Sequence, residues 1–195
     1  MSPTREQLRR ATQKRVVDAA NRLFQERGFA ATTIRDVAEA SGVSIGSVMA
    51  AGDKSDLLVR VFDALIEAEH AQRDAGAAPA EESHCVRRVM ALVQPFVSLF
   101  VGRQELARAY ASILVSGNHT STLFSELAAR LIDEIRAAIT QHGCTGATDA
   151  APRAGALYFA YIGNLFAWSA RGAADPSELD AALRTTFAAI CSCKE

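Results

Sequence analysis

The chain has 195 residues, of which 49% are hydrophobic and 22% are charged, and its formal net charge is −1. This composition is too apolar for a disordered protein, and the length allows a sizeable core. Charge interrupts every apolar run before it could span a bilayer, and the basic, polar N-terminus does not resemble a secretory signal. We therefore expect a globular cytoplasmic protein that makes no membrane contact.

Charge is distributed unevenly along the chain. Residues 1–54 hold nine Lys/Arg against six Asp/Glu, for a charge of +3, whereas the remainder holds twelve against sixteen, for −4. A basic head on an acidic body suits a protein that meets a polyanion at one end, although ordinary surface variation also produces asymmetries of this size.

Helical periodicity begins at residue 16, and Gly28 is expected to end the first helix. Its apolar positions recur at the spacing of one helix face: Val16, Ala19, Ala20, Leu23 and Phe24. Thr33 predicts a cap for a second helix, and Ser44 a cap for a third that ends by Gly52. Two short helices crossed through the small-residue turn 41–43 are the geometry that places one helix in a DNA major groove.

The rest of the chain also predicts helices, because period-two alternation is absent and Ala, Leu, Arg and Glu dominate. Asp53 is expected to cap a long helix that breaks at 73–79, and Asp175-Pro176 to start the last one. Between them, helical patterns cover 82–101 (kinked or interrupted at Pro95), 106–115, 121–141 and 153–170. We predict an all-α protein of about nine helices, with a three-helix helix-turn-helix head at 1–52 and a helical body at 53–195.

No catalytic or metal-binding pattern stands out in the sequence. A nucleophile with a paired base, a phosphate loop and cysteine pairs at zinc-site spacing are all missing. We therefore expect neither an enzyme nor a bound metal or cofactor, and we expect the four cysteines to be thiols. The four histidines (His70, His84, His119 and His142) lie in polar segments and are predicted to be at the surface.

The head resembles that of the tetracycline-repressor (TetR) family of transcriptional regulators over residues 10–58. The residues that carry this resemblance are Leu23-Phe24, Glu26, Gly28-Phe29, Thr32-Thr33-Ile34, Asp36-Val37-Ala38, Ser41-Gly42-Val43-Ser44 and Gly46-Ser47. The resemblance implies a homodimeric, ligand-responsive regulator, usually a repressor, that binds a palindromic operator in double-stranded DNA. It also implies an effector pocket in the body and dimerisation through the last two helices.

By resemblance, Thr33 matches a phosphate-contacting threonine, with Thr32 beside it, and Lys54 matches a phosphate-binding lysine. The leading end of the third helix, where base edges are read, holds Ser44, Ile45, Gly46 and Ser47. The chain departs from the family at Met49-Ala50-Ala51-Gly52, where a Tyr-x-x-Phe pattern is usual, so Met49 replaces a phosphate-binding tyrosine.

This departure leaves two hypotheses for the head. The predicted reading face (Ile45, Ser47, Ala50 and Ala51) can touch thymine methyls but makes few bidentate base contacts, each of which is worth about 1–3 kcal/mol. The head either relies on phosphates, DNA shape and a basic arm in the minor groove, or has become a degenerate ligand- or protein-binding module. We favour retained DNA binding, because the basic head and intact caps have no other evident use. The basic arm comprises Arg5, Arg9, Arg10, Lys14 and Arg15. A solvated, disordered tail explains this segment equally well.

The resemblance also places functional sites in the body. The resemblance predicts an effector pocket for a small apolar or aromatic molecule, although spacing alone more often indicates plain core for the residues concerned. They are Phe62, Met90, Phe96, Phe100, Tyr110 and Phe124. A dimer interface, as opposed to packing within one chain only, is expected at Tyr158, Tyr161, Ile162, Leu165, Phe166, Leu183, Phe187 and Ile190. Effector binding is predicted to tilt the fourth helix and so change the separation of the two recognition helices.

Overall fold

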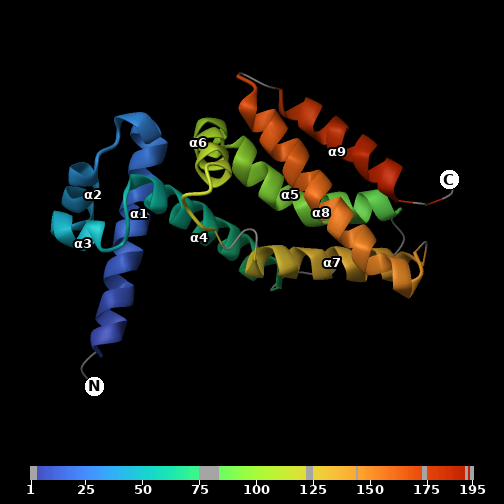
Figure 1. Ribbon diagram of the computed structural model, residues 1–195, viewed down its shortest axis with the longest axis horizontal. Helices are drawn as coiled ribbons and strands as arrows, with labels where there is room; N and C mark the ends of the chain where they lie inside the picture. Colours follow the sequence, from blue (N-terminus) through green and yellow to red (C-terminus); the bar gives the residue numbers. More distant parts are fainter. Residues whose placement is uncertain are drawn as a thin grey trace. The chain divides into compact units, whose positions relative to one another are not determined.

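Nine α-helices make up the regular structure of this computed structural model, which describes residues 4–74, 84–121, 125–143, 145–172, 175–191 and 193 (Figure 1). They are α1 (Arg5–Ala31), α2 (Ile34–Ser41), α3 (Ile45–Met49), α4 (Lys54–Asp74), α5 (Cys85–Val101), α6 (Gln104–Val115), α7 (Glu126–His142), α8 (Ala147–Ala170) and α9 (Pro176–Ile190). The predicted all-α class and helix count are confirmed.

The chain divides into two compact units. The head unit comprises Met1–Leu65 and Glu105–Ser121, and the body unit comprises Ile66–Gln104 and Thr122–Glu195. In the head unit, α1 packs against α2, and α2 against α3 (Figure 1). In the body unit, α7 and α9 each pack against both α5 and α8. The functional boundary predicted between residues 52 and 53 falls within the head unit and stays a proposal.

Polar caps start four of the helices, as predicted. The side chains of Thr33, Ser44, Asp53 and Asp175 each accept a hydrogen bond from a backbone N–H in the first turn of the helix that follows. Pro176 occupies the first turn of α9. Such a cap contributes about 1 kcal/mol relative to alanine. The caps therefore fix where α2, α3, α4 and α9 begin.

The predicted apolar face of α1 is the core of the head unit. All five of its predicted positions are buried: Val16, Ala19, Ala20, Leu23 and Phe24. Gly28 has φ 80° and ψ 160°, so the helical backbone breaks there as predicted, although α1 resumes as far as Ala31. No single helix in the described segments is long and apolar enough to cross a membrane; only α5 and α6 together, as a bent pair, meet the length and composition of a span.

Candidate nucleic-acid interface

A glycine-centred turn joins α2 to α3. Gly42 adopts the left-handed conformation (φ 65°, ψ 33°), which glycine reaches without steric cost. The Gly42 N–H donates to the Glu39 carbonyl at 3.2 Å, and the Val43 N–H donates to the Ala38 carbonyl at 3.1 Å. These paired bonds form a Schellman motif, which satisfies the last carbonyls of α2 and fixes the direction in which α3 departs.

The recognition helix α3 is short, and its outer face is mainly apolar. Val48 is fully buried and anchors α3 to the head core, whereas Ile45 and Met49 are 47% and 51% exposed. Gly46 and Ala50, which follow Ile45 and Met49 in the chain, are exposed as well. This face can contact thymine methyl groups and the sugar edge of a groove, but it carries no long hydrogen-bonding side chain.

Two serines supply the polar groups at the start of α3. Ser44 Oγ accepts from the Ser47 N–H at 3.1 Å, and the two hydroxyl oxygens lie 2.9 Å apart. Because one hydroxyl donates to the other, one hydroxyl proton stays available to a phosphate or a base. Ala51, which the sequence placed on the reading face, is only 2% exposed and belongs to the head core.

The two adjacent threonines before α2 have different environments. Thr33 is exposed, and its hydroxyl donates to Asp36 Oδ2 at 2.6 Å. Hydrogen bonds from Thr33, followed by the nearby Arg27, hold the pKa of Asp36 below its usual value. Thr32 is 1% exposed, and its hydroxyl donates to the Gly28 carbonyl at 2.9 Å. Because the buried Thr32 hydroxyl closes the end of α1, it does not face a phosphate as the resemblance implied.

Lys54 closes the end of α1 from the other side. Its Nζ donates to the Phe29 carbonyl at 3.0 Å and lies 4.5 Å from the centroid of the Phe29 ring. An ammonium group at a helix C-terminus is stabilised by the unpaired carbonyls there. Lys54 has three N–H donors, so it can hold this helix end and also reach a phosphate.

The predicted basic arm is helical. Thr4 and Gln7 form a reciprocal capping box, and α1 begins at Arg5. An α-helix of about 10 Å diameter does not enter a minor groove of about 6 Å. The segment is therefore neither an arm in the minor groove nor a solvated, disordered tail. The signal for the longer helix lies in the sequence as a Thr followed three residues later by a Gln.

A groove of about 320 Å³ lies between the N-terminal part of α1 and the C-terminal part of α3. From α1 it is lined by Leu8, Arg9, Thr12 and Gln13, and from α3 and the residues after it by Ser47, Ala50 and Ala51. Sequence reasoning assigned no role to Leu8, Thr12 or Gln13, because the segment was not recognised as helix. The groove places a guanidinium group and an amide beside the apolar reading face.

Gly52 carries the short connection from α3 to α4. Its φ of +133° lies in the region that favours glycine, and a Cβ there would lie 2.4 Å from Asp56 Cβ. We expect Gly52→Ala to lower the free energy of unfolding by about 1–3 kcal/mol from backbone strain, and by more if the overlap is not relieved. Urea unfolding measures this effect. Gly46→Ala is the matched control: its Cβ would meet only Ser44 Oγ, at 3.8 Å, so it should be neutral or slightly stabilising. Equal losses in both variants would contradict this account of the connection.

The first turn of α4 is linked to the segment after α6. His119 Nδ1 lies 2.8 Å from Asp56 Oδ1, and Asp56 is also the capping partner of Asp53. The hydrogen bond with His119 is the largest cause that lowers the pKa of Asp56, despite partial burial. His119, predicted at the surface, thus has a half-buried structural role.

Because the pKa of Asp56 is lowered in the folded state, the contribution of its carboxylate to the free energy of unfolding depends on pH. It is fully present above the ordinary aspartate value of 3.8 and is lost as the pH falls through the lower folded value. We expect Asp56→Asn to lower stability at pH 7 by about 0.5–1 kcal/mol, since the carboxylate is 42% exposed, and to weaken the acid dependence below pH 4. Urea unfolding at a series of pH values measures this, with Asp149→Asn as an exposed control. An unchanged pH dependence would contradict the assignment.

The predicted effector residues are divided between the two units. In the head unit, the Phe62 and Tyr110 rings are stacked with centroids 4.4 Å apart. The Tyr110 hydroxyl bonds Ser121 Oγ at 2.9 Å, and Ser121 donates to Asp63 at 2.5 Å. In the body unit, α5 carries the buried residues Met90, Phe96 and Phe100. Phe124 lies outside the described residues.

A buried histidine adds a polar group that sequence reasoning missed. His70 was predicted at the surface, but it is 1% exposed and its ring lies 4.7 Å from that of Phe96. Its Nδ1 is 3.5 Å from Glu134 Oε1, and neither ring nitrogen makes a hydrogen bond within the described structure. The prediction failed because the polar sequence around His70 belongs to the outer faces of α4, whereas His70 faces the core.

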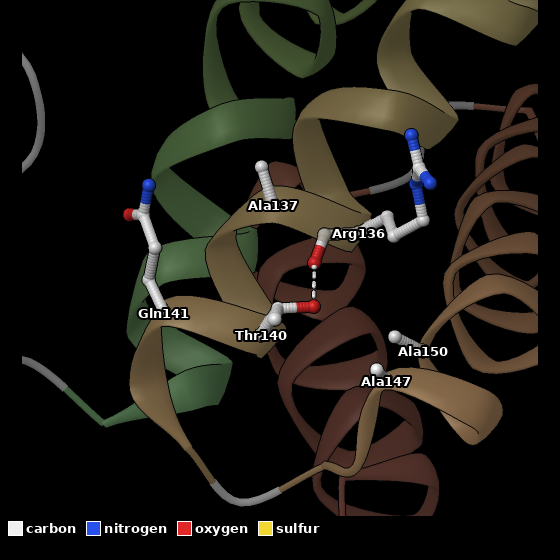
Figure 2. Close-up of a pocket in the computed structure, with 6 residues that line it drawn as sticks. All are labelled: Arg136, Ala137, Thr140, Gln141, Ala147 and Ala150. Atoms are coloured by element: carbon white, nitrogen blue, oxygen red, sulfur yellow. Dashed lines mark hydrogen bonds between the residues drawn. The ribbon is translucent and has the colours of Figure 1, made fainter.

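The hollow drawn in Figure 2 has about 340 Å³ and lies between α7 and α8. Ala137, Ala147 and Ala150 contribute apolar surface, and the Thr140 hydroxyl already donates to the Arg136 carbonyl at 2.8 Å. Figure 2 shows the side chains of Arg136 and Gln141 extending to opposite sides of α7. The hollow therefore lacks convergent polar groups, and none of the predicted effector residues lines it.

Most of the predicted dimer residues lie in the chain's own core. Six are buried within the body unit (Tyr158, Tyr161, Ile162, Leu165, Leu183 and Phe187), whereas Phe166 and Ile190 are half-buried. The neighbouring Phe159 is instead 64% exposed on α8, and exposed Gly163 lies one helical turn further along. The surface that α8 leaves open thus carries Phe159, a residue that the prediction omitted.

The capped helix pair, its Schellman turn and the long α1 beside it define a helix-turn-helix head on an all-helical body. Residues 16–61 match the family model described as bacterial regulatory proteins, tetR family. This match confirms the resemblance to that family predicted for the head, and the fold of the whole chain is that of solved TetR-family regulators.

Three solved structures illustrate the similarity of fold. A TetR transcriptional regulator from Rhodococcus sp. RHA1 is 16% identical with a TM-score of 0.66, covering 94% of this chain and 96% of that one. A TetR transcription regulator from Haloarcula marismortui ATCC 43049 is 19% identical with a TM-score of 0.64, covering 93% and 97%. Thermus thermophilus FadR, a TetR-family repressor in complex with lauroyl-CoA, is 19% identical with a TM-score of 0.62, covering 94% and 97%. A comparison with curated proteins finds no match.

Proposed function

We propose that this chain is a homodimeric, ligand-responsive transcriptional regulator that represses its target and releases a palindromic operator when a small apolar or aromatic effector binds. The observation that carries this proposal is the α2–turn–α3 geometry, which lies inside the segment that matches the tetR family model. The protein acts in the cytoplasm, without enzymatic activity and without a cofactor.

DNA contacts are proposed on one side of the head unit. Ser44, Ile45, Gly46, Ser47, Met49 and Ala50 of the recognition helix enter the major groove, and Thr33 and Lys54 contact phosphates. Arg9, in the groove beside α3, adds a phosphate contact that replaces the missing tyrosine at Met49. Because few base edges are read directly, much of the affinity comes from phosphates and DNA shape.

The second subunit is proposed to pack on the exposed side of α8 around Phe159. In this proposal, the buried residues of the predicted interface pack within their own chain under Phe159, and the half-buried Phe166 and Ile190 contact the partner at the edge of the interface. An exposed phenylalanine beside Gly163 allows two helices to approach closely across a two-fold axis.

The proposed switch runs through α4. This helix contributes residues to both units, its first turn begins at the proposed phosphate contact Lys54, and it carries Phe62 and His70. Among the structural relatives, FadR was solved with lauroyl-CoA and the multidrug binding protein EbrR with imidazole. An effector that favours one position of α4 needs a differential affinity of about 1–3 kcal/mol to couple to DNA.

Selection of bound fragments from random duplex DNA at moderate salt tests the proposal. We expect enrichment of a palindromic sequence, and an affinity for it that falls steeply with salt concentration. Binding without any sequence preference, or no binding in dilute buffer, would instead support the degenerate module whose head no longer reads DNA, which the unusual segment 49–52 favours.

A further inference from the structure

Three helix ends of the body unit bring sulfur and imidazole ligands together. Cys85 is the first residue of α5, His142 is the last residue of α7, and Cys191 caps the end of α9, with Cys193 two residues beyond. The ligand atoms of Cys85, His142 and Cys193 all lie within 4.8 Å of one another. Cys193 Sγ is 3.8 Å from His142 Nδ1, and Cys191 Sγ is 3.2 Å from Cys85 Sγ.

The spacings of Cys85, His142 and Cys193 are compatible with a tetrahedral zinc site. Cys191 contacts Cys85 but does not belong to that mutually close set, so its thiol must turn toward His142 and Cys193 to become the fourth ligand. At a Zn–S distance of about 2.3 Å, two sulfur ligands stand about 3.8 Å apart, and three cysteines with one histidine are an established ligand set for structural zinc. The sequence does not reveal this set, because none of its pairs has the spacing of a zinc motif. Cys191 and Cys193 are near each other but are separated by a single residue, and the other members lie more than forty residues apart.

The surroundings of the cluster also favour a cation. His142 and Cys191 stand at the C-terminal ends of α7 and α9, which carry the negative ends of two helix dipoles. Cys85 begins α5, whose positive end favours the thiolate form of that ligand. Cys85 and Cys191 are buried, whereas His142 and Cys193 are half-buried and leave a path from solvent.

We propose that Cys85, Cys191, Cys193 and His142 bind one Zn²⁺ ion in the body unit. The bound ion ties the segment after α9 to the start of α5 and the end of α7, so metal binding stabilises the body unit. The site contains none of the residues proposed to bind DNA or the organic effector, and its test does not depend on operator binding.

The experiment uses the full-length protein, reduced, treated with chelator and desalted without oxygen, and then titrated with Co²⁺. We expect one equivalent to produce the intense visible bands of tetrahedral cobalt with a thiolate charge-transfer band, and one equivalent of Zn²⁺ to displace it. Thermal unfolding should shift to higher temperature with Zn²⁺. A weak octahedral cobalt spectrum, or a stoichiometry well below one, would overturn the proposal.

Variants separate a built site from adventitious thiol binding. Cys193→Ser and His142→Gln alter half-buried residues, so the fold should persist by circular dichroism, while Zn²⁺ affinity falls on the order of 100-fold or more. His84→Gln is the matched control: its exposed ring lies 6.5 Å from that of His142 but outside the ligand set, so affinity should be unchanged. Unchanged affinity in Cys193→Ser and His142→Gln, or an equal loss in His84→Gln, would show that the ligand set is wrong.

Discussion

Ile45→Glu is expected to weaken operator binding by about 2–4 kcal/mol, on the order of 100-fold in Kd, while leaving the fold intact. Ile45 is the first residue of α3 and is 47% exposed, so the substitution removes little from the core. In the proposed complex, the new carboxylate enters a groove lined by phosphates and loses its water without gaining a partner. Fluorescence anisotropy with the selected operator, at fixed salt, measures the change.

Val115→Glu is the matched control for Ile45→Glu. It introduces the same charge at an apolar residue of the same unit that is 79% exposed at the end of α6. We expect it to bind the operator within about twofold of the wild type, because a distant surface charge acts only through screened electrostatics. If both variants lose affinity equally, or neither does, α3 is not the element that enters the groove.

Phe159→Glu is expected to convert the proposed dimer to monomers. A phenylalanine that is 64% exposed in one chain contributes little to that chain's core. A central aromatic residue in an interface, in contrast, often contributes about 2–4 kcal/mol to association. In a two-fold interface each subunit supplies one copy, so the substitution acts twice and places two like charges near each other. Analytical ultracentrifugation measures the shift in dissociation constant.

Loss of the dimer should also reduce operator affinity, since a monomer engages one half-site only. Val115→Glu again serves as the control, and it should remain dimeric. A Phe159→Glu protein that stays dimeric at micromolar concentration would place the interface elsewhere, whereas a monomer that retains full operator affinity would refute the two-fold arrangement on DNA.

Local signals in the sequence were sufficient for the helices and for the head. Caps at Thr33, Ser44, Asp53 and Asp175, and the apolar face of α1, depend on residues within one or two turns, so the sequence displays them directly. The start of α1 was predicted too late in the chain, although its signal is also local. Thr4 and Gln7 have the spacing of a capping box, and they start the helix at Arg5.

Features that join distant segments were not predictable in the same way. The burial of His70 depends on α5 and α7, which supply Phe96 and Glu134. The Cys85–His142–Cys193 cluster joins three segments, each more than fifty residues from the next along the chain. Likewise, whether an apolar residue of α8 faces its own core or a partner depends on where α5 and α9 pack. Periodicity predicted an apolar helix, but it did not distinguish buried Tyr158 from exposed Phe159.

Hydroxyl-radical footprinting of the full-length protein on its selected operator most directly tests the central claim that two α3 helices enter successive major grooves of one duplex. We predict two protected half-sites related by a two-fold axis, with centres about 34–36 Å apart, or a multiple of that distance. Protection of a single half-site, or uniform protection that is independent of sequence, would contradict the account.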